Sequence, residues 1–130
     1  MTATYLDSSA VVKLAVREKE SVALRRYLRR RRPLVSSSLA RTEVIRALLP
    51  GGDDAVGAGR KVLTRLDLIR VSTSVLDEAA VLLPSDLRSL DAIHLATAHR
   101  LGQDLGVIVT YDERMAEAAK HLGHRVAAPR

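Results

Sequence analysis

Four carboxylates stand at positions where an α/β protein would carry its active site. Asp7 follows the apolar run Ala3–Leu6, and Asp112 comes just after a β-branched run. Asp91 lies in the first turn of the most helical stretch of the chain, and Glu43 lies within another predicted helix. Carboxylates that are brought together repel one another unless a cation neutralises them. These residue types therefore indicate a metal site built from oxygen ligands.

Each of these acids also has a structural explanation when it is considered alone. Asp and Ser side chains routinely cap helices, so Asp7 could simply start the next helix. The helix dipole favours Asp91 in a first turn, and Glu43 could be exposed and paired with an arginine. Considering the four acids together favours a metal site, and we then expect Ser8 or Ser9 to cap the helix in place of Asp7.

The available donor atoms select the kind of ion. The chain has no cysteine, which excludes disulfides, thiolate nucleophiles and thiolate-bound zinc or iron–sulfur centres. Carboxylate oxygens favour Mg²⁺ or Mn²⁺. One or two such ions would activate a water and stabilise the charge that builds on a phosphodiester during in-line displacement. Hydrolysis of a nucleic-acid backbone is the reaction that this array suits.

Strands and helices alternate along the chain, which predicts an α/β fold with a mostly parallel sheet of four to five strands. The first strand is expected to end at Leu6, and four further strands are expected over 33–36, 68–71, 106–110 and 124–127. Helices are expected over 9–16, 18–31, 39–49, 60–67, 74–83, 89–101 and 112–122. Strand carboxyl ends and helix N-termini meet at one rim of such a sheet. Three of the acids can therefore converge there, and Glu43 can reach in from a helix face.

One glycine-rich segment is predicted to be a simple connection. Pro50–Asp54 breaks the helical pattern, and Gly57 and Gly59 are expected to keep the following residues irregular. A phosphate-binding loop would require a Lys-Ser or Lys-Thr pair after a strand, and both features are missing.

Composition limits the class of protein. A chain of 130 residues is expected to form a single domain, 1–130, with its own core. No apolar run reaches the length of a membrane span, so we expect a cytoplasmic protein without a membrane partner. The net charge of +6, with 17 arginines, is compatible with a polyanionic partner. Three tyrosines and no Phe or Trp cannot form a base-stacking platform, so contacts with nucleic acid would depend on phosphates.

The four arginines Arg29, Arg30, Arg31 and Arg32 form the densest run of charge. They lie at the C-terminus of a predicted helix, where positive charge complements the negative end of the helix dipole. One interpretation is therefore that they are simply solvated charges at a helix end. Contact with RNA phosphates explains them equally well. Both interpretations stay open at the level of sequence.

The acids lie in recognisable motifs. These are Tyr5-Leu6-Asp7-Ser8-Ser9-Ala10, Thr42-Glu43-Val44, Ser89-Leu90-Asp91-Ala92-Ile93-His94-Leu95-Ala96-Thr97-Ala98 and Val109-Thr110-Tyr111-Asp112. Together they resemble the four acidic motifs of PIN-domain ribonucleases, particularly the VapC toxins of bacterial toxin–antitoxin modules. The similarity covers essentially the whole chain. It implies a PIN-like three-layer α/β/α sandwich.

The resemblance also implies an activity and partners. Such proteins are Mg²⁺- or Mn²⁺-dependent endoribonucleases that cut tRNA, rRNA or mRNA, commonly form homodimers and are inhibited by a cognate antitoxin. By resemblance, Asp7 and Asp91 would bind the metal directly, and Glu43 and Asp112 would complete the acidic pocket. The hydroxyls of Ser9 and Thr110 would orient these carboxylates. Asp112 is followed by Glu113-Arg114-Met115, where some relatives carry a further acid or an aromatic residue. The role of Asp112 is therefore the least defined of the four.

The two histidines of the Asp91 helix have no predicted metal-binding role. His94 and His99 do not share a helix face, which argues against a metal-binding pair. We expect His94 to pack on or hydrogen-bond to Asp91, one turn earlier, rather than act as a catalytic base.

The main rival function is a catalytically inactive PIN-fold module that binds RNA or an antitoxin. A second rival is a phosphotransferase or phospho-receiver with Asp7 as nucleophile.

Overall fold

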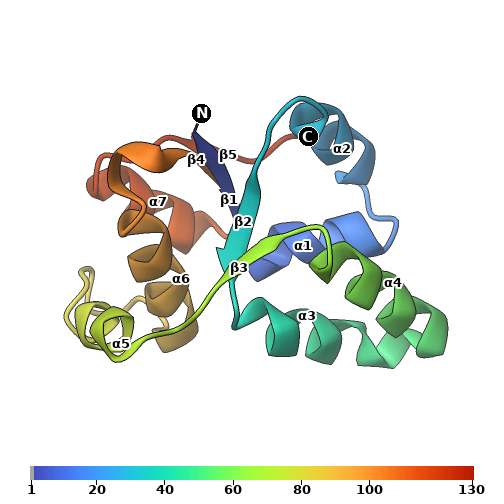
Figure 1. Cartoon of the computed structure of the whole chain (residues 1–130), viewed down its shortest axis with the longest axis horizontal. Coiled ribbons are helices and arrows are strands. Elements are labelled where there is room, and N and C mark those ends of the chain that lie inside the picture. Colours follow the sequence, from blue (N-terminus) through green and yellow to red (C-terminus); the bar gives the residue numbers. More distant parts are fainter. Residues whose placement is uncertain (1) are drawn as a thin grey trace.

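The computed structural model describes residues 2–130 and shows a sheet of five parallel strands (Figure 1). The strands are β1 (Ala3–Leu6), β2 (Leu34–Ser37), β3 (Asp67–Ile69), β4 (Leu105–Val109) and β5 (Val126–Ala127). Their order across the sheet is β3-β2-β1-β4-β5, with Leu6 paired with Val109 at the end of β1. The predicted α/β fold with a parallel sheet is confirmed.

Helices cover both faces of this sheet, as Figure 1 shows. They are α1 (Ser8–Ala15), α2 (Ser21–Leu28), α3 (Ala40–Leu48), α4 (Asp53–Leu63), α5 (Thr73–Ala80), α6 (Ser89–His99) and α7 (Glu113–His121), with short 3₁₀ turns at Leu49–Gly51 and Gly102–Asp104. Helices α1 to α4 pack on one face, and α6 and α7 pack on the other. The expected three-layer arrangement is therefore present.

Alternation along the strands gives each face of the sheet its own hydrophobic core. Leu6 and Val109 face the core formed with α1 to α4, whereas Tyr5 and Ile108 face α6 and α7. All four side chains are fully buried. A strand buried on both faces reads as a continuous apolar run, which explains why these short strands can be recognised in the sequence.

The predicted break at residues 50–52 is present, but the expectation that the chain stays irregular through Gly59 is wrong. Helix α4 begins at Asp53 and includes Gly57 and Gly59. Gly52, at φ +85°, starts the helix from a conformation that suits glycine. A Cβ at Gly59 would lie 2.5 Å from a methyl carbon of Leu48 on α3. The close approach of α3 and α4 therefore uses this glycine, and tertiary packing overrides its low helix propensity.

Gly57 offers a test of this interpretation. A Cβ at Gly57 would meet no atom within 4 Å, so Gly57→Ala would gain helix propensity without a clash. We expect the free energy of unfolding to rise by about 1 kcal/mol, measured by urea denaturation. The matched variant Gly59→Ala should gain less, because its Cβ enters the α3–α4 contact. Equal gains for both variants would contradict a packing role for Gly59.

The strand order creates one topological switch point. The chain moves outward in one direction from β1 through β2 to β3, and then returns to add β4 and β5 on the other side of β1. Ligands of open α/β sheets bind beyond the carboxyl ends of the strands at such a point. Asp7, directly after β1, is therefore in the expected position. Across residues 2–130 we find no helix with the length and apolar character needed to span a bilayer.

Candidate active site

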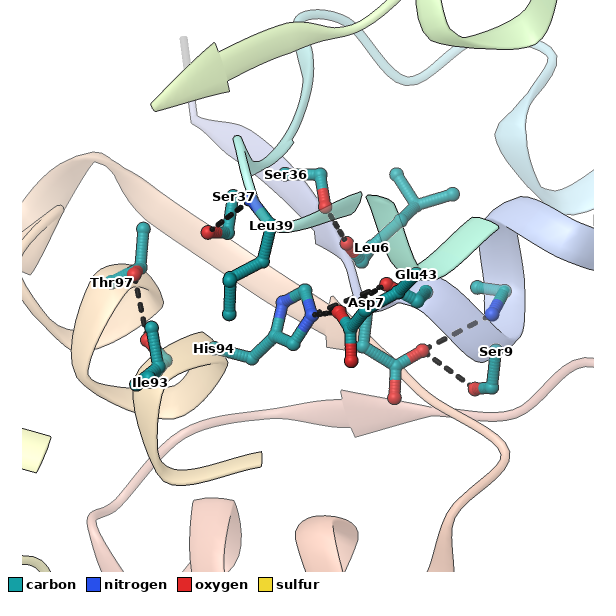
Figure 2. A network of polar contacts seen from close by, with 12 residues as sticks. Leu6, Asp7, Ser9, Ser36, Ser37, Leu39, Glu43, Ile93, His94 and Thr97 are labelled. Atoms are coloured by element: carbon teal, nitrogen blue, oxygen red, sulfur yellow. Dashed lines mark hydrogen bonds and ion pairs between the residues drawn. The ribbon is translucent and has the colours of Figure 1, made fainter. Parts of the chain in front are cut away.

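Asp7 is the most buried of the four predicted acids, with only 4% of its surface exposed. Its Oδ1 accepts hydrogen bonds from Ser9 Oγ at 2.6 Å and from the Ala10 amide at 3.1 Å. Its Oδ2 accepts a short hydrogen bond from Thr110 Oγ1. Ser9 and Thr110, the two hydroxyls predicted to orient the carboxylates, thus both donate to Asp7. Figure 2 shows the contact with Ser9.

The expectation that Ser8 or Ser9 caps α1 is wrong. Asp7 is the N-cap, with extended backbone angles and its carboxylate on the Ala10 amide. The Ser9 hydroxyl instead donates to that same carboxylate. A carboxylate has roughly four acceptor positions. Asp7 can therefore cap the helix, accept two hydroxyl donors and keep an acceptor position on Oδ2.

Burial changes the charge state that Asp7 prefers. Removal from water raises the pKa of Asp7, and the hydrogen bonds from Ser9 and Thr110 oppose this shift without cancelling it. The buried carboxylate therefore lacks full compensation by the protein when it is ionised. A cation at the free position on Oδ2 would supply the missing stabilisation.

Glu43 reaches the rim from α3, half-buried. Its Oε1 accepts hydrogen bonds from Ser8 Oγ at 2.7 Å and from His94 Nε2 at 2.6 Å. Burial raises the pKa of Glu43, but the hydrogen bonds from His94 and Ser8 outweigh it and hold the pKa below its usual range. Of the two interpretations of Glu43, the inward-facing one is correct.

Among residues 2–130, His94 does not hydrogen-bond to the residue that the sequence suggested. The expected partner is Asp91, but the hydrogen bonds of His94 go to Glu43, Ser8 and Tyr5. Asp91 lies in the first turn of α6 and is partly buried, whereas His94 faces the sheet and is fully buried. The sequence reasoning also missed Tyr5 and Ser8. The available signal was period-two alternation, which places Tyr5 and Asp7 on the same side of β1.

Asp91 and Asp112 complete the acidic rim. Asp91 lies at the start of α6, where burial first, and then the negative charges of Asp112 and Asp7, raise its pKa. Asp112 caps α7, with Oδ1 accepting the amides of Arg114 and Met115. The negative charge of Glu43 acts on the pKa of Asp91 in the same direction.

The donor set suits a hydrated divalent ion. Among residues 2–130, no three Asp, Glu or His side chains stand close enough to ligate one ion together. Mg²⁺ commonly keeps several waters and binds one or two carboxylates. Over the same range, Asp91 accepts no hydrogen bond, and the hydrogen bonds of Asp112 fall only on Oδ1. Free carboxylate oxygens, with no thiolate, fit Mg²⁺ or Mn²⁺.

The arginine run lies away from this rim. Arg29 to Arg32 follow α2 and lead into the start of β2, whose neighbour Pro33 accepts a hydrogen bond from the Thr4 amide at the beginning of β1. They are therefore at the end of the sheet opposite Asp7. Arg31 stacks on Tyr27 at 4.1 Å, and Arg32 donates to the Leu28 carbonyl. Arg29 and Arg30 are exposed.

His99 is separate from the acidic rim. Its Nδ1 lies 2.8 Å from His124 Nε2, near β5, whereas His94 belongs to the rim. The prediction that His94 and His99 do not form a metal-binding pair is consistent with this geometry.

Comparison with known proteins identifies the family. A PIN domain matches residues 4–121. The chain belongs to the PIN-domain family. It is 67% identical over 129 residues to Ribonuclease VapC46 of Mycobacterium tuberculosis, with 99% of each chain covered. It is 42% identical to Ribonuclease VapC35 of the same species, with 96% of each chain covered. These similarities place it in the VapC branch of the PIN-domain proteins.

Solved structures agree with this PIN fold. The M. tuberculosis VapC20 structure, described as a toxin that cleaves the sarcin–ricin loop, superposes with a TM-score of 0.73 at 18% identity, covering 88% of this chain and 94% of that one. A toxin–antitoxin complex from Klebsiella pneumoniae gives a TM-score of 0.72 at 21% identity, covering 98% of both chains. At these identities the likeness establishes the fold.

Proposed function

We propose that this VapC-family ribonuclease hydrolyses RNA phosphodiester bonds as an endonuclease at the rim formed by Asp7, Glu43, Asp91 and Asp112, with Mg²⁺ or Mn²⁺ held there. The observation that carries the proposal is the state of Asp7. It is almost completely buried, its pKa is raised, and it keeps one acceptor position on Oδ2 beyond the hydrogen bond from Thr110. Such an arrangement is costly for a structural carboxylate and suits a cation ligand.

Each acid has a proposed role. Asp7 and Asp91 bind the ion directly, since Asp7 keeps one acceptor position on Oδ2 and Asp91 accepts no hydrogen bond among residues 2–130. Glu43 and Asp112 complete the pocket, either through water or as ligands of a second ion. Ser9 and Thr110 hold the Asp7 carboxylate in one rotamer, which preserves the orientation of its free Oδ2 lone pair.

The ion would supply an activated water and neutralise charge on the scissile phosphate. The protein's own contribution is to fix the carboxylates before RNA binds. Asp7 is held by three hydrogen bonds and Glu43 by two, so little reorganisation is required during the reaction. The absence of Phe and Trp favours recognition of RNA through its phosphates and shape.

The biological role proposed is that of the toxin in a toxin–antitoxin module. The relatives are named VapC ribonucleases, and a structural neighbour is a toxin–antitoxin complex. An antitoxin that covers the rim would inhibit the enzyme by keeping RNA from the carboxylates. A homodimer and a cytoplasmic location are part of the same proposal. Co-expression with the product of an adjacent small open reading frame should restore growth that the toxin alone arrests.

One experiment tests both activity and substrate. Brief expression of the wild-type chain, followed by sequencing of newly formed RNA ends, should reveal one or a few cleavage sites in tRNA, rRNA or mRNA. The matched variant Asp91→Asn should abolish these ends without loss of folded protein. New ends that persist in Asp91→Asn would contradict the role of Asp91. The absence of new ends with the wild-type chain would favour the alternative function, an inactive RNA- or antitoxin-binding module.

A contribution of Arg29, Arg30, Arg31 and Arg32 to RNA binding is also proposed, and their exposure supports it. In the inactive Asp91→Asn background, replacing all four by Ala should weaken RNA binding. It should also flatten the dependence of log K on log salt by about 0.7 for each RNA phosphate that the arginines neutralise. The double variant Arg29→Ala/Arg30→Ala preserves the Arg31–Tyr27 and Arg32–Leu28 contacts and serves as the matched form. An unchanged slope would assign these arginines a solvated role.

A further inference from the structure

His94 is a buried titratable side chain that the proposed reaction does not use. Only 1% of its surface is exposed, and it lies between β1 and α3 on the inner face of α6. Both ring nitrogens have partners: Nδ1 lies 2.7 Å from the Tyr5 hydroxyl, and Nε2 lies 2.6 Å from Glu43 Oε1. Figure 2 shows the imidazole directed at Glu43, beside Asp7.

The partners of His94 define which nitrogen carries hydrogen. A carboxylate can only accept, so Nε2 must donate to Glu43 when that acid is ionised. The Ser8 hydroxyl, 3.2 Å from Nε2, already donates its own hydrogen to Glu43 and can share the Nε2 hydrogen only as an acceptor. The Tyr5 hydroxyl can then donate to Nδ1. The arrangement therefore forms a chain of donors from Tyr5 through His94 to Glu43.

Both donors to Glu43 act on the same oxygen. Ser8 and His94 contact Oε1, which leaves Oε2 without a hydrogen bond among residues 2–130. A glutamate on a helix face has several accessible rotamers, and fixing one oxygen selects among them. Two donors on Oε1 thus determine where Oε2 lies relative to Asp7 and Asp91.

We propose that His94 is a positioning residue, which donates from Nε2 to Glu43 Oε1 and thereby presents Oε2 to the cation site, with Tyr5 fixing the orientation of the imidazole. This inference rests on the proposed function, because it assigns a purpose to the fixed Glu43 carboxylate. Partners that orient a metal ligand typically change metal affinity or activity by 10- to 100-fold when they are removed. A buried histidine with a purely structural role would give no such selective effect.

Two conservative variants separate positioning from packing. The amide nitrogen of Gln can occupy the place of His Nε2, whereas that of Asn corresponds to Nδ1. We expect His94→Gln to keep Mn²⁺ affinity and kcat within about threefold of wild type. We expect His94→Asn to lose about 10- to 100-fold in both. Thermal melting of the metal-free proteins controls for stability, because both variants replace the same buried ring by an amide.

Two readouts do not depend on turnover. Direct Mn²⁺ binding, followed by electron paramagnetic resonance, should weaken for His94→Asn and for Glu43→Gln. Long-range ¹⁵N–¹H spectra of the imidazole should show hydrogen on Nε2, and Tyr5→Phe should shift the Nδ1 signal. A neutral ring with hydrogen only on Nδ1 would overturn the proposal. So would equal Mn²⁺ affinity for the Gln and Asn variants.

The outcome for Glu43→Gln distinguishes the two proposals. If this variant binds Mn²⁺ and cleaves RNA like wild type, the proposed acidic site fails at Glu43. If Glu43→Gln is impaired while His94→Asn and His94→Ala behave like wild type, the site stands and the positioning role of His94 is wrong.

Discussion

Asp7→Asn is expected to lower the rate of RNA cleavage by about a thousandfold or more and to raise the melting temperature of the metal-free protein. The loss of activity follows because the amide cannot serve as an anionic ligand. Charge stabilisation by a bound ion contributes several kcal/mol, and each 1.36 kcal/mol corresponds to a factor of ten. Steady-state cleavage and calorimetry measure the two effects.

The gain in stability follows from the raised pKa of Asp7. Burial makes ionisation harder in the folded chain than in the unfolded one. The pKa of Asp7 is therefore higher in the folded chain than in the unfolded chain. As the pH rises from the unfolded-state pKa through the folded-state pKa, ionisation of Asp7 lowers the free energy of unfolding of the wild-type protein. Asn carries no charge and can still accept the Ala10 amide. The difference in unfolding free energy between variant and wild type should therefore widen from acid to neutral pH and then level off.

The exposed carboxylate Asp77 of α5 provides the matched control. Asp77→Asn makes the same chemical change away from the rim, and we expect unchanged cleavage and little change in melting temperature. Wild-type activity in Asp7→Asn would contradict the proposed site. Lower stability of Asp7→Asn at neutral pH would instead show that the ionised carboxylate is well compensated in the folded protein.

Removal of divalent ions is expected to produce an equally large effect. Cleavage should stop in excess EDTA and return when Mg²⁺ or Mn²⁺ is restored, because the acids alone cannot offset charge on the phosphate. The ion should also stabilise the fold, by about 2.7 kcal/mol at a concentration 100 times its Kd. Calorimetry with increasing Mn²⁺ measures this gain.

The dependence on Asp7 makes the metal experiment specific. The increase in melting temperature with Mn²⁺ should disappear in Asp7→Asn and persist in Asp77→Asn. Undiminished cleavage in EDTA would contradict a metal-dependent mechanism. A melting temperature that rises equally in Asp7→Asn would place the bound ion elsewhere on the protein.

The elements that carry the acids were predictable because their signals are local. The apolar run before Asp7 and the β-branched run before Thr110 predict buried strands, and the regular pattern around Asp91 predicts a buried helix. Alternation of these elements was sufficient for a parallel α/β sheet. In such a sheet the ends of β1 and β4 must share a rim with the start of α6.

The errors arose where a residue's role depends on a distant neighbour. Gly57 and Gly59 predicted an irregular segment, but the packing of α4 on α3 makes a helix and uses Gly59 as the contact. Helix propensity differs by about 1 kcal/mol between Gly and Ala, which tertiary packing readily exceeds. The start of α4 therefore depends on its packing against α3, which the local sequence pattern does not reveal.

Residue type and local pattern were enough to predict the family and the parallel sheet, and to select four acids as candidate metal ligands. Only the tertiary structure decided how the acids are held: Asp7 caps α1, and His94 bonds to Glu43 rather than to its sequence neighbour Asp91. Hydrogen bonds between side chains 51 positions apart depend on strand order and helix rotation. No local pattern encodes that geometry, because it arises only when α3 and α6 meet across the end of β1.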